Sequence, residues 1–192
     1  QRAYNRPSWQ ETLNGVILAF NERRHEIDAQ AENLTSHLLK ANSFSIQKSE
    51  KEQILSPGNA KEIFENIMKS ADKEWGGFGK APKFPQTFSI QYLLRYYHIT
   101  KEETALSQAL LSLDKMIEGG IYDQLGGGFA RYSTDNEWLA PHFEKMLYDN
   151  ALLVSVLSEA YQLTKTERYK EMIEETMAFI QREMLHPEKG FY

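Results

Sequence analysis

The residues best suited to chemistry lie in the stretch 119–150, which combines glycine, aromatic and ionisable side chains. Proline is favoured as the first residue of a helix, so we expect a helix over 141–164. On that helix His142, Lys145 and Asp149 are three and four residues apart and share one side. The spacing therefore predicts a cluster of ionisable groups at one end of a mostly apolar helix.

Three of these groups are candidate catalytic residues. His142 is expected in the first turn, where the helix dipole favours neutral imidazole, and neutral histidine can act as a general base. Asp149 and Glu144 are the acidic candidates. The structural alternative gives His142 a hydrogen bond to the neighbouring loop and Asp149 a salt bridge with Lys145 or Arg131. In that alternative, Glu144 only complements the helix dipole.

Side chains suited to a sugar crowd the loop that precedes this helix. Aromatic faces beside acidic and amide groups match the apolar C–H faces and the hydroxyls of a sugar ring. The bulky aromatics could equally fill the rim between helices. The candidate substrate-binding residues are Tyr122, Asp123, Arg131, Trp138 and Lys145.

Composition excludes several classes of function. The formal net charge is −5, which gives no electrostatic basis for binding nucleic acid. The chain has no cysteine, which excludes disulfides, thiol catalysis and cysteine-ligated zinc and favours the cytoplasm. We predict no membrane span and no signal peptide, since no long apolar run is present. Without an initiator methionine, the sequence reads as a piece of a longer chain.

Common motifs for nucleotides and metals are also missing. Residues 77–79 lack the third glycine of a dinucleotide fingerprint, and 79–80 are not followed by the Ser or Thr of a Walker motif. Residues 142–144 lack the cysteines of a zinc deaminase, and residues two apart on a helix do not face each other. We therefore predict no metal and no cofactor.

The elements that must position these residues read as helices. Ser8 and Glu11 form a capping box that opens a first helix, and a second helix continues to about residue 41. The polar segment 42–57 is interpreted as a linker and the best domain boundary. Further helices are expected at 59–71, 88–98, 102–118, 141–164 and 166–185. The segment 75–86 is too rich in glycine and proline for regular structure, and 120–139 is expected to form a short strand pair or an extended loop.

An internal repeat predicts the architecture. The Gly-Phe motifs at 76–78, 127–129 and 189–191 each follow a helical segment, and they begin 51 and 62 residues apart. Recurrence at about 50 residues is typical of stacked helical hairpins. The stretch 151–157 is apolar nearly all round, which predicts burial on every face. Buried helices alternating with more exposed ones indicate part of an all-α fold, an α/α toroid, with short strands in the glycine-rich loops.

Three segments carry a family resemblance: WGGFGKAPKFPQ, GGIYDQLGGGFARYSTDNEWLAPHFEKMLYDNALL and HPEKGFY. They resemble the thioredoxin-domain-containing family that includes spermatogenesis-associated protein 20 and the bacterial YyaL proteins. The resemblance implies a thioredoxin-like domain, absent here, followed by a toroid similar to N-acylglucosamine 2-epimerases and six-hairpin glycosidases. Residues 1–41 would then follow the absent domain, and 58–192 would form an incomplete toroid.

Two functions remain open at this level. The first is a fragment of a carbohydrate-processing or sugar-binding toroid, with His142 in proton transfer and a sugar or sugar-like molecule as partner. The second is a non-catalytic scaffold for the thioredoxin-like domain, with the side chains of 119–150 mutually satisfied. An open half-ring leaves apolar helix faces uncovered, so we expect a homo-oligomer.

Overall fold

The computed structural model describes residues 7–42 and 57–191, and the chain divides into two compact units, Gln1–Gln53 and Ile54–Tyr192. The predicted linker 42–57 lies, apart from its two end residues, outside the described residues. Within the described ranges, no helix is long and apolar enough to cross a membrane.

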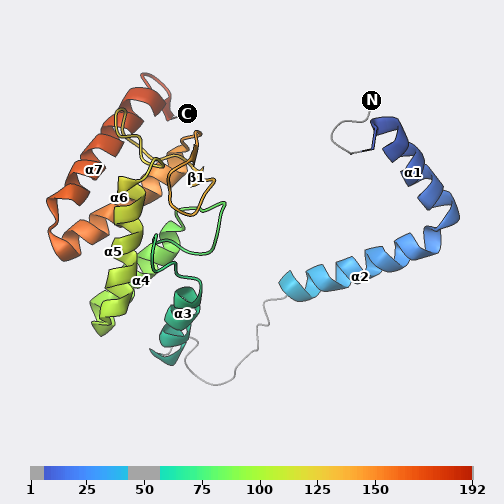
Figure 1. Cartoon of the computed structure of the whole chain (residues 1–192), viewed down its shortest axis with the longest axis horizontal. Coiled ribbons are helices and arrows are strands. Elements are labelled where there is room, and N and C mark those ends of the chain that lie inside the picture. The colour runs from blue at the N-terminus through green and yellow to red at the C-terminus, as the bar shows by residue number, and fades with distance from the viewer. Residues whose placement is uncertain (1–6, 43–56, 192) are drawn as a thin grey trace. The chain divides into compact units, whose positions relative to one another are not determined.

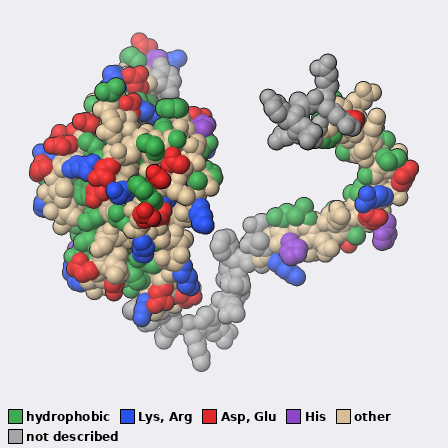
Figure 2. Space-filling view, in the orientation of Figure 1, with side chains coloured by type: hydrophobic (Ala, Val, Ile, Leu, Met, Phe, Trp, Pro, Cys, Tyr) green, Lys and Arg blue, Asp and Glu red, His purple; other side chains and the backbone are tan. Residues whose placement is uncertain are grey.

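The N-terminal unit consists of helices α1 (Trp9–Glu22) and α2 (Arg24–Asn42). The predicted capping box is confirmed, because Ser8 N–H donates to Glu11 Oε2 at 2.8 Å and Glu11 N–H donates to Ser8 Oγ at 3.3 Å. No residue of α1 is buried. Its apolar side chains Leu13, Val16, Ile17, Leu18 and Phe20 remain exposed. Figure 2 shows hydrophobic side chains on the surface of this unit.

The C-terminal unit is built from helices α3 (Pro57–Lys69), α4 (Thr87–Thr100), α5 (Glu103–Glu118), α6 (Leu147–Thr164) and α7 (Glu167–Phe179). A π-helical turn, η1 (Ile180–Met184), continues α7. Helices α4 and α5 pack as one hairpin and α6 and α7 as another, and α4 also packs directly on α6 (Figure 1). In a ring of hairpins the inner helices lie at the smaller radius and touch one another, so α4 and α6 are the inner pair and α5 and α7 the outer pair.

The core lies between these two layers. It includes Leu93 and Leu94 of α4, Leu113 and Met116 of α5, and Leu157 of α6, all almost fully buried. The expectation that 151–157 would be buried on every face is wrong, because Ala151 and Ser155 are exposed. They are four residues apart and therefore lie on the same side of α6.

The expected helix start at residue 141 is also wrong. Residues Pro141–His142 form strand β2, which pairs antiparallel with β1 (Tyr132–Ser133), and α6 begins only at Leu147. The backbone pairing continues to Glu144, whose carbonyl accepts from Arg131 N–H at 2.8 Å. Cross-strand pairing thus overrides the local preference of proline for a helix start. Of the two alternatives for 120–139, the short strand pair is the one observed. Its first strand, β1, lies within that range, and its second strand, β2, begins two residues after residue 139.

The Gly-Phe repeat is a structural repeat. Ala71 pairs with Phe78, and Tyr122 pairs with Phe129, each closing a glycine-rich turn. The third motif closes in the same way, because β3 (Leu185–His186) pairs with β4 (Gly190–Phe191). The first turn lies between α3 and α4 and the second between α5 and α6, and the two loops meet where Lys83 pairs with Ser133.

Each of the first two turns contains an aspartate–lysine clamp. Asp72 Oδ1 accepts from the N–H groups of Glu74 and Trp75, and Asp123 Oδ1 accepts from those of Leu125 and Gly126. The second oxygen of each aspartate binds a lysine ammonium at 2.7 Å (Lys83 for Asp72, Lys145 for Asp123).

Each clamp closes over an aromatic ring, Trp138 under Lys83 and Phe179 under Lys145, at 5.1 and 4.3 Å from ammonium to ring centroid. Glycine is required where the turn meets that ring. Gly77 and Gly128 have φ of +72° and +82°, and a Cβ at either would lie 2.5 Å from the ring beside it. The clamps therefore depend on backbone that comes close to an aromatic face.

Candidate functional site

The extended backbone of β2 and the residues after it divide the predicted site into two faces. Side chains along a strand alternate between faces, whereas the predicted helix would have brought residues three and four apart together. His142 and Glu144 therefore lie on one face, and Phe143 and Lys145 lie on the other. The predicted cluster of His142, Lys145 and Asp149 on one helix side is not formed, and His142 is not in the first turn of α6.

The first face carries a ladder of aromatic rings. Tyr132 and His142 are direct cross-strand partners, and their rings stack with centroids 4.6 Å apart. Phe84, from the first glycine-rich loop, packs on Tyr132 at 4.8 Å. Phe84 is 43% exposed and the side chain of His142 is 45% exposed, so the ladder presents an aromatic surface to solvent.

Ionisable groups border this ladder. Glu144 Oε2 lies 3.3 Å from Arg131 Nη1 and 3.7 Å from His142 Nδ1, and all three side chains are 40–51% exposed. Asp149 lies in the first turn of α6. The charge of Arg131 acts to lower the pKa of its carboxyl, but the two side chains do not form a salt bridge. The structural alternative of a salt bridge from Asp149 to Lys145 or Arg131 is therefore wrong, because those cations pair with Asp123 and Glu144.

Asp149 is the least satisfied of these groups. Its Oδ2 atom is buried and has no hydrogen-bond partner among the described residues. Burial raises the pKa of the Asp149 carboxyl, and the charge of Arg131 opposes this only in part. A carboxyl whose pKa is raised in this way is suited to giving and taking a proton.

On the second face, the predicted binding residues already form hydrogen bonds with other groups of the protein. Lys145 Nζ donates to Asp123 Oδ2 and to the carbonyl of Gly127, both at 2.7 Å. Bonds from Lys145 and from the backbone N–H groups lower the pKa of Asp123 to about 2, so this carboxylate is ionised at neutral pH. The residues predicted to bind a substrate here are thus the second aspartate–lysine clamp.

Two further predicted binding residues are buried in the core. Trp138 is fully buried, and its Nε1–H donates to the carbonyl of Trp75 at 2.8 Å. Tyr122 is 2% exposed, and its hydroxyl donates to Glu175 Oε2. Burial, followed by the bond to Glu175, raises the pKa of the Tyr122 hydroxyl. Of the predicted binding set, only Arg131 lies with its side chain on the exposed ladder face.

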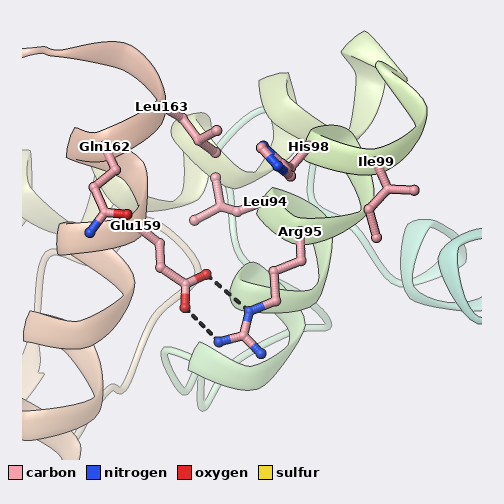
Figure 3. Close-up of a pocket in the computed structure, with 7 residues that line it drawn as sticks. All are labelled: Leu94, Arg95, His98, Ile99, Glu159, Gln162 and Leu163. Atoms are coloured by element: carbon pink, nitrogen blue, oxygen red, sulfur yellow. Dashed lines mark hydrogen bonds and ion pairs between the residues drawn. The ribbon is translucent and has the colours of Figure 1, made fainter.

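Cavities of about 350 and 440 Å³ lie near these elements, and a further one of about 400 Å³ lies beside Asp72 of the first clamp. The cavity of about 350 Å³ opens on the second face, beside the clamp (Asp123, Lys145, Phe143, Leu125 and Tyr122 among its lining). The cavity of about 440 Å³ lies between the second halves of α4 and α6 and is drawn in Figure 3. There Arg95 forms a bidentate ion pair with Glu159, and His98 also lines the cavity. Over the described residues, no group of three potential metal ligands gathers at one point.

Comparison with solved structures defines the class of fold as an α/α toroid. The chain superposes on a sugar epimerase from a ruminal bacterium with a TM-score of 0.61 and 18% identity, over 70% of this chain and 38% of that one. An α-mannanase of Bacteroides thetaiotaomicron matches with a TM-score of 0.57 and 17% identity, over 67% and 38%. No protein-family model matches the chain.

Within that class, the chain belongs to the family of spermatogenesis-associated protein 20. It is 41% identical to the human protein of that name over 133 residues, which is 67% of this chain and 17% of that protein. The rat protein is 31% identical over 191 residues, which is 97% of this chain and 24% of that protein. The chain thus spans less than a quarter of the length of these curated relatives.

Sequence reasoning missed the aromatic ladder and the clamps. Phe84 and Tyr132 belong to different loops, and only the pairing of Lys83 with Ser133 brings them together. The clamps had a visible signal, since both turns read Asp-x-x-x-Gly-Gly-Phe. An aspartate at a fixed distance from a repeated turn is typical of a turn that uses its carboxylate to bind backbone N–H groups.

Proposed function

We propose that this chain supplies one wall of a sugar-binding site in a carbohydrate-processing α/α toroid, formed by residues 58–192. The observation that carries the proposal is the solvent-exposed ladder of Phe84, Tyr132 and His142 beside Arg131, Glu144 and the unpaired Asp149. Aromatic faces next to ionisable groups match the two kinds of surface that a sugar ring presents. Support also comes from the toroids of similar fold, which are named as a sugar epimerase and a mannanase.

In this proposal the residues have distinct roles. The rings of Tyr132 and His142 hold one face of the sugar, while Arg131 and Glu144 bond its hydroxyls. Asp149 is the proton-transfer group, because its pKa is raised and one oxygen has no protein partner. The cysteine-free composition favours the cytoplasm as the compartment.

The proposal predicts that Asp149→Asn weakens sugar binding without lowering the free energy of unfolding. The raised pKa means that ionised Asp149 destabilises the folded state above its unfolded pKa, and asparagine removes that unfavourable charge. At pH 7 the free energy of unfolding is therefore expected to stay within about 0.5 kcal/mol or to rise. Binding or turnover of a panel of mannose, glucose, cellobiose and their phosphates, measured on the full-length polypeptide by calorimetry and NMR, is expected to fall at least about tenfold.

Asp114→Asn is the matched control. Asp114 is also a half-buried carboxyl whose pKa burial raises, but it accepts a hydrogen bond from Tyr169 at 2.9 Å, between the outer helices. Because its pKa is also raised and asparagine keeps an oxygen that can accept from Tyr169, this variant is expected to match Asp149→Asn in stability and to leave sugar binding unchanged. If Asp149→Asn and His142→Ala both bind the whole panel as the unmodified protein does, or if that protein binds none of it, the proposed function is wrong.

The second candidate function is a non-catalytic scaffold. The observation that favours it is that Tyr122, Asp123, Trp138 and Lys145 are all bonded within the protein. A scaffold requires that all polar side chains of 119–150 are bonded within the protein. Against this, Asp149 Oδ2 has no partner among the described residues, and His142 is half exposed. The panel experiment decides between the two candidates.

Self-association of this chain is a further part of the proposal. Helices α4 and α6 expose Phe88 (71%), Ile99 (80%) and Tyr148 (50%), and exposed apolar area of this kind drives association. Light scattering is expected to show a dimer or larger species, and Phe88→Glu is expected to shift it toward monomer. A stable monomer at high concentration would contradict this expectation.

A further inference from the structure

In the first copy of the repeat, the clamp is covered by the loop of the second copy. Lys83 and Ser133 exchange both backbone hydrogen bonds, at 2.8 and 2.9 Å. Asn136 then bonds twice, because its carbonyl accepts from Lys83 Nζ at 3.0 Å and its Oδ1 accepts from Ala81 N–H at 2.6 Å. As a result the side chain of Lys83 is completely buried.

In the second copy, the equivalent positions have no such cover. Lys145 corresponds to Lys83, and Phe143, two residues earlier, corresponds to Ala81. The Lys145 side chain is 20% exposed, and Phe143 is 87% exposed. A cavity of about 350 Å³ lies beside Asp123 and Lys145. The first copy has an equivalent cavity of about 400 Å³ beside Asp72, and there Asn136 of the covering loop forms part of its lining.

The backbone of β2 and the residues that follow it form one edge of a small sheet. The strand pairs run from Lys83 to β1 and from β1 to β2, and through the described part of the chain no strand pairs with the outer side of β2. Alternate residues of a strand direct their N–H groups to opposite sides, and the N–H groups of Phe143 and Lys145 have no acceptor among residues 57–191. An unpaired strand edge is a template for another strand.

We propose that the outer edge of β2 is the docking site for a strand from a further copy of the repeat in the same polypeptide. The strand would exchange backbone bonds with Lys145 and offer a side-chain acceptor to Phe143 N–H, as Ser133 and Asn136 do in the first copy. This surface lies on the face opposite the proposed sugar site.

The repeat locates the docking strand in the sequence. Ser133, which pairs with Lys83, comes four residues after Phe129 of its own Gly-Phe motif. The third motif ends at Phe191, so its equivalent residue comes after Tyr192. The curated relatives extend well beyond the matched region, since this chain spans 17% of the human protein and 24% of the rat protein.

A second copy of this chain is a poorer occupant. The strand that it would have to offer is β1, and β1 is already paired on both sides, with Lys83 and with β2. A strand joined in the same polypeptide also docks at a high effective concentration, with no loss of free energy to bimolecular association.

Hydrogen exchange tests the proposal. The 192-residue chain is compared with the full-length natural polypeptide, and exchange is followed at the amides of Phe143 and Lys145. Both amides are expected to exchange rapidly in the 192-residue chain and about 100-fold more slowly in the full-length polypeptide. Ala81 and Lys83, whose N–H groups are already bonded, serve as internal controls and should be protected in both.

Equal exchange of Phe143 and Lys145 in the two polypeptides would overturn the proposal. Protection in the 192-residue chain that rises with concentration would also overturn it, because a second copy would then be the occupant. In the full-length polypeptide, Phe143→Pro removes the donor and should abolish the protection of Lys145, whereas Phe143→Ala keeps the donor and should not. No sugar enters these measurements, so their outcome is independent of the proposed function.

Discussion

Trp138→Ala is expected to lower the free energy of unfolding of the C-terminal unit by about 3–5 kcal/mol. Trp138 is completely buried, its indole N–H donates to the carbonyl of Trp75, and its ring lies against Gly77 and under the ammonium group of Lys83. Alanine leaves a cavity beneath the first clamp and a carbonyl without its donor. Urea unfolding followed by circular dichroism measures the change.

Leu139→Ala is the matched control for this substitution. Leu139 is the next residue in the chain but is 68% exposed, so its truncation is expected to change stability by less than about 0.5 kcal/mol. Comparable losses for the two variants would show that Trp138 does not support the core. A loss of sugar binding by Trp138→Ala at unchanged stability would restore the sequence-based interpretation of Trp138 as a binding residue.

The fold could be predicted because its main signal is repetition. The three Gly-Phe motifs mark three equivalent turns, and the structure closes each of them with the same strand pairing. Helices before and after such turns have enough periodic apolar residues to be recognised, although α6 begins six positions later than expected. The toroid expected from this pattern is confirmed by the similarity to solved toroids.

The geometry of the site could not be predicted, because it depends on pairing between segments distant in sequence. Pro141 has the local character of a helix start, yet the pairing of Tyr132 with His142 extends the backbone there. That one change moves Lys145 to the opposite face from His142 and Glu144. The partner of Lys145 is Asp123, 22 positions earlier, which no helical spacing could indicate.

The two clamps provide a further test, because the same ion pair occurs at two levels of burial. Lys83→Met is expected to destabilise the C-terminal unit by about 3–5 kcal/mol, since methionine keeps the packing of the stem but leaves Asp72 without its cation. The Lys83 side chain is 0% exposed and that of Asp72 is 20% exposed, so water replaces little of the lost interaction.

Lys145→Met is expected to cost about 1 kcal/mol or less, because its pair is 20% and 40% exposed and solvent screens the remaining Asp123 charge. Chemical unfolding of both variants, and of Asp72→Asn with Lys83→Met, measures the coupling. The double variant should recover part of the loss, because no unpaired charge then remains beneath the second loop. Equal costs for Lys83→Met and Lys145→Met would mean that the loop of the second copy does not strengthen the clamp that it covers. In that case a strand docked beside Lys145 would be expected to add little to the stability of the second clamp.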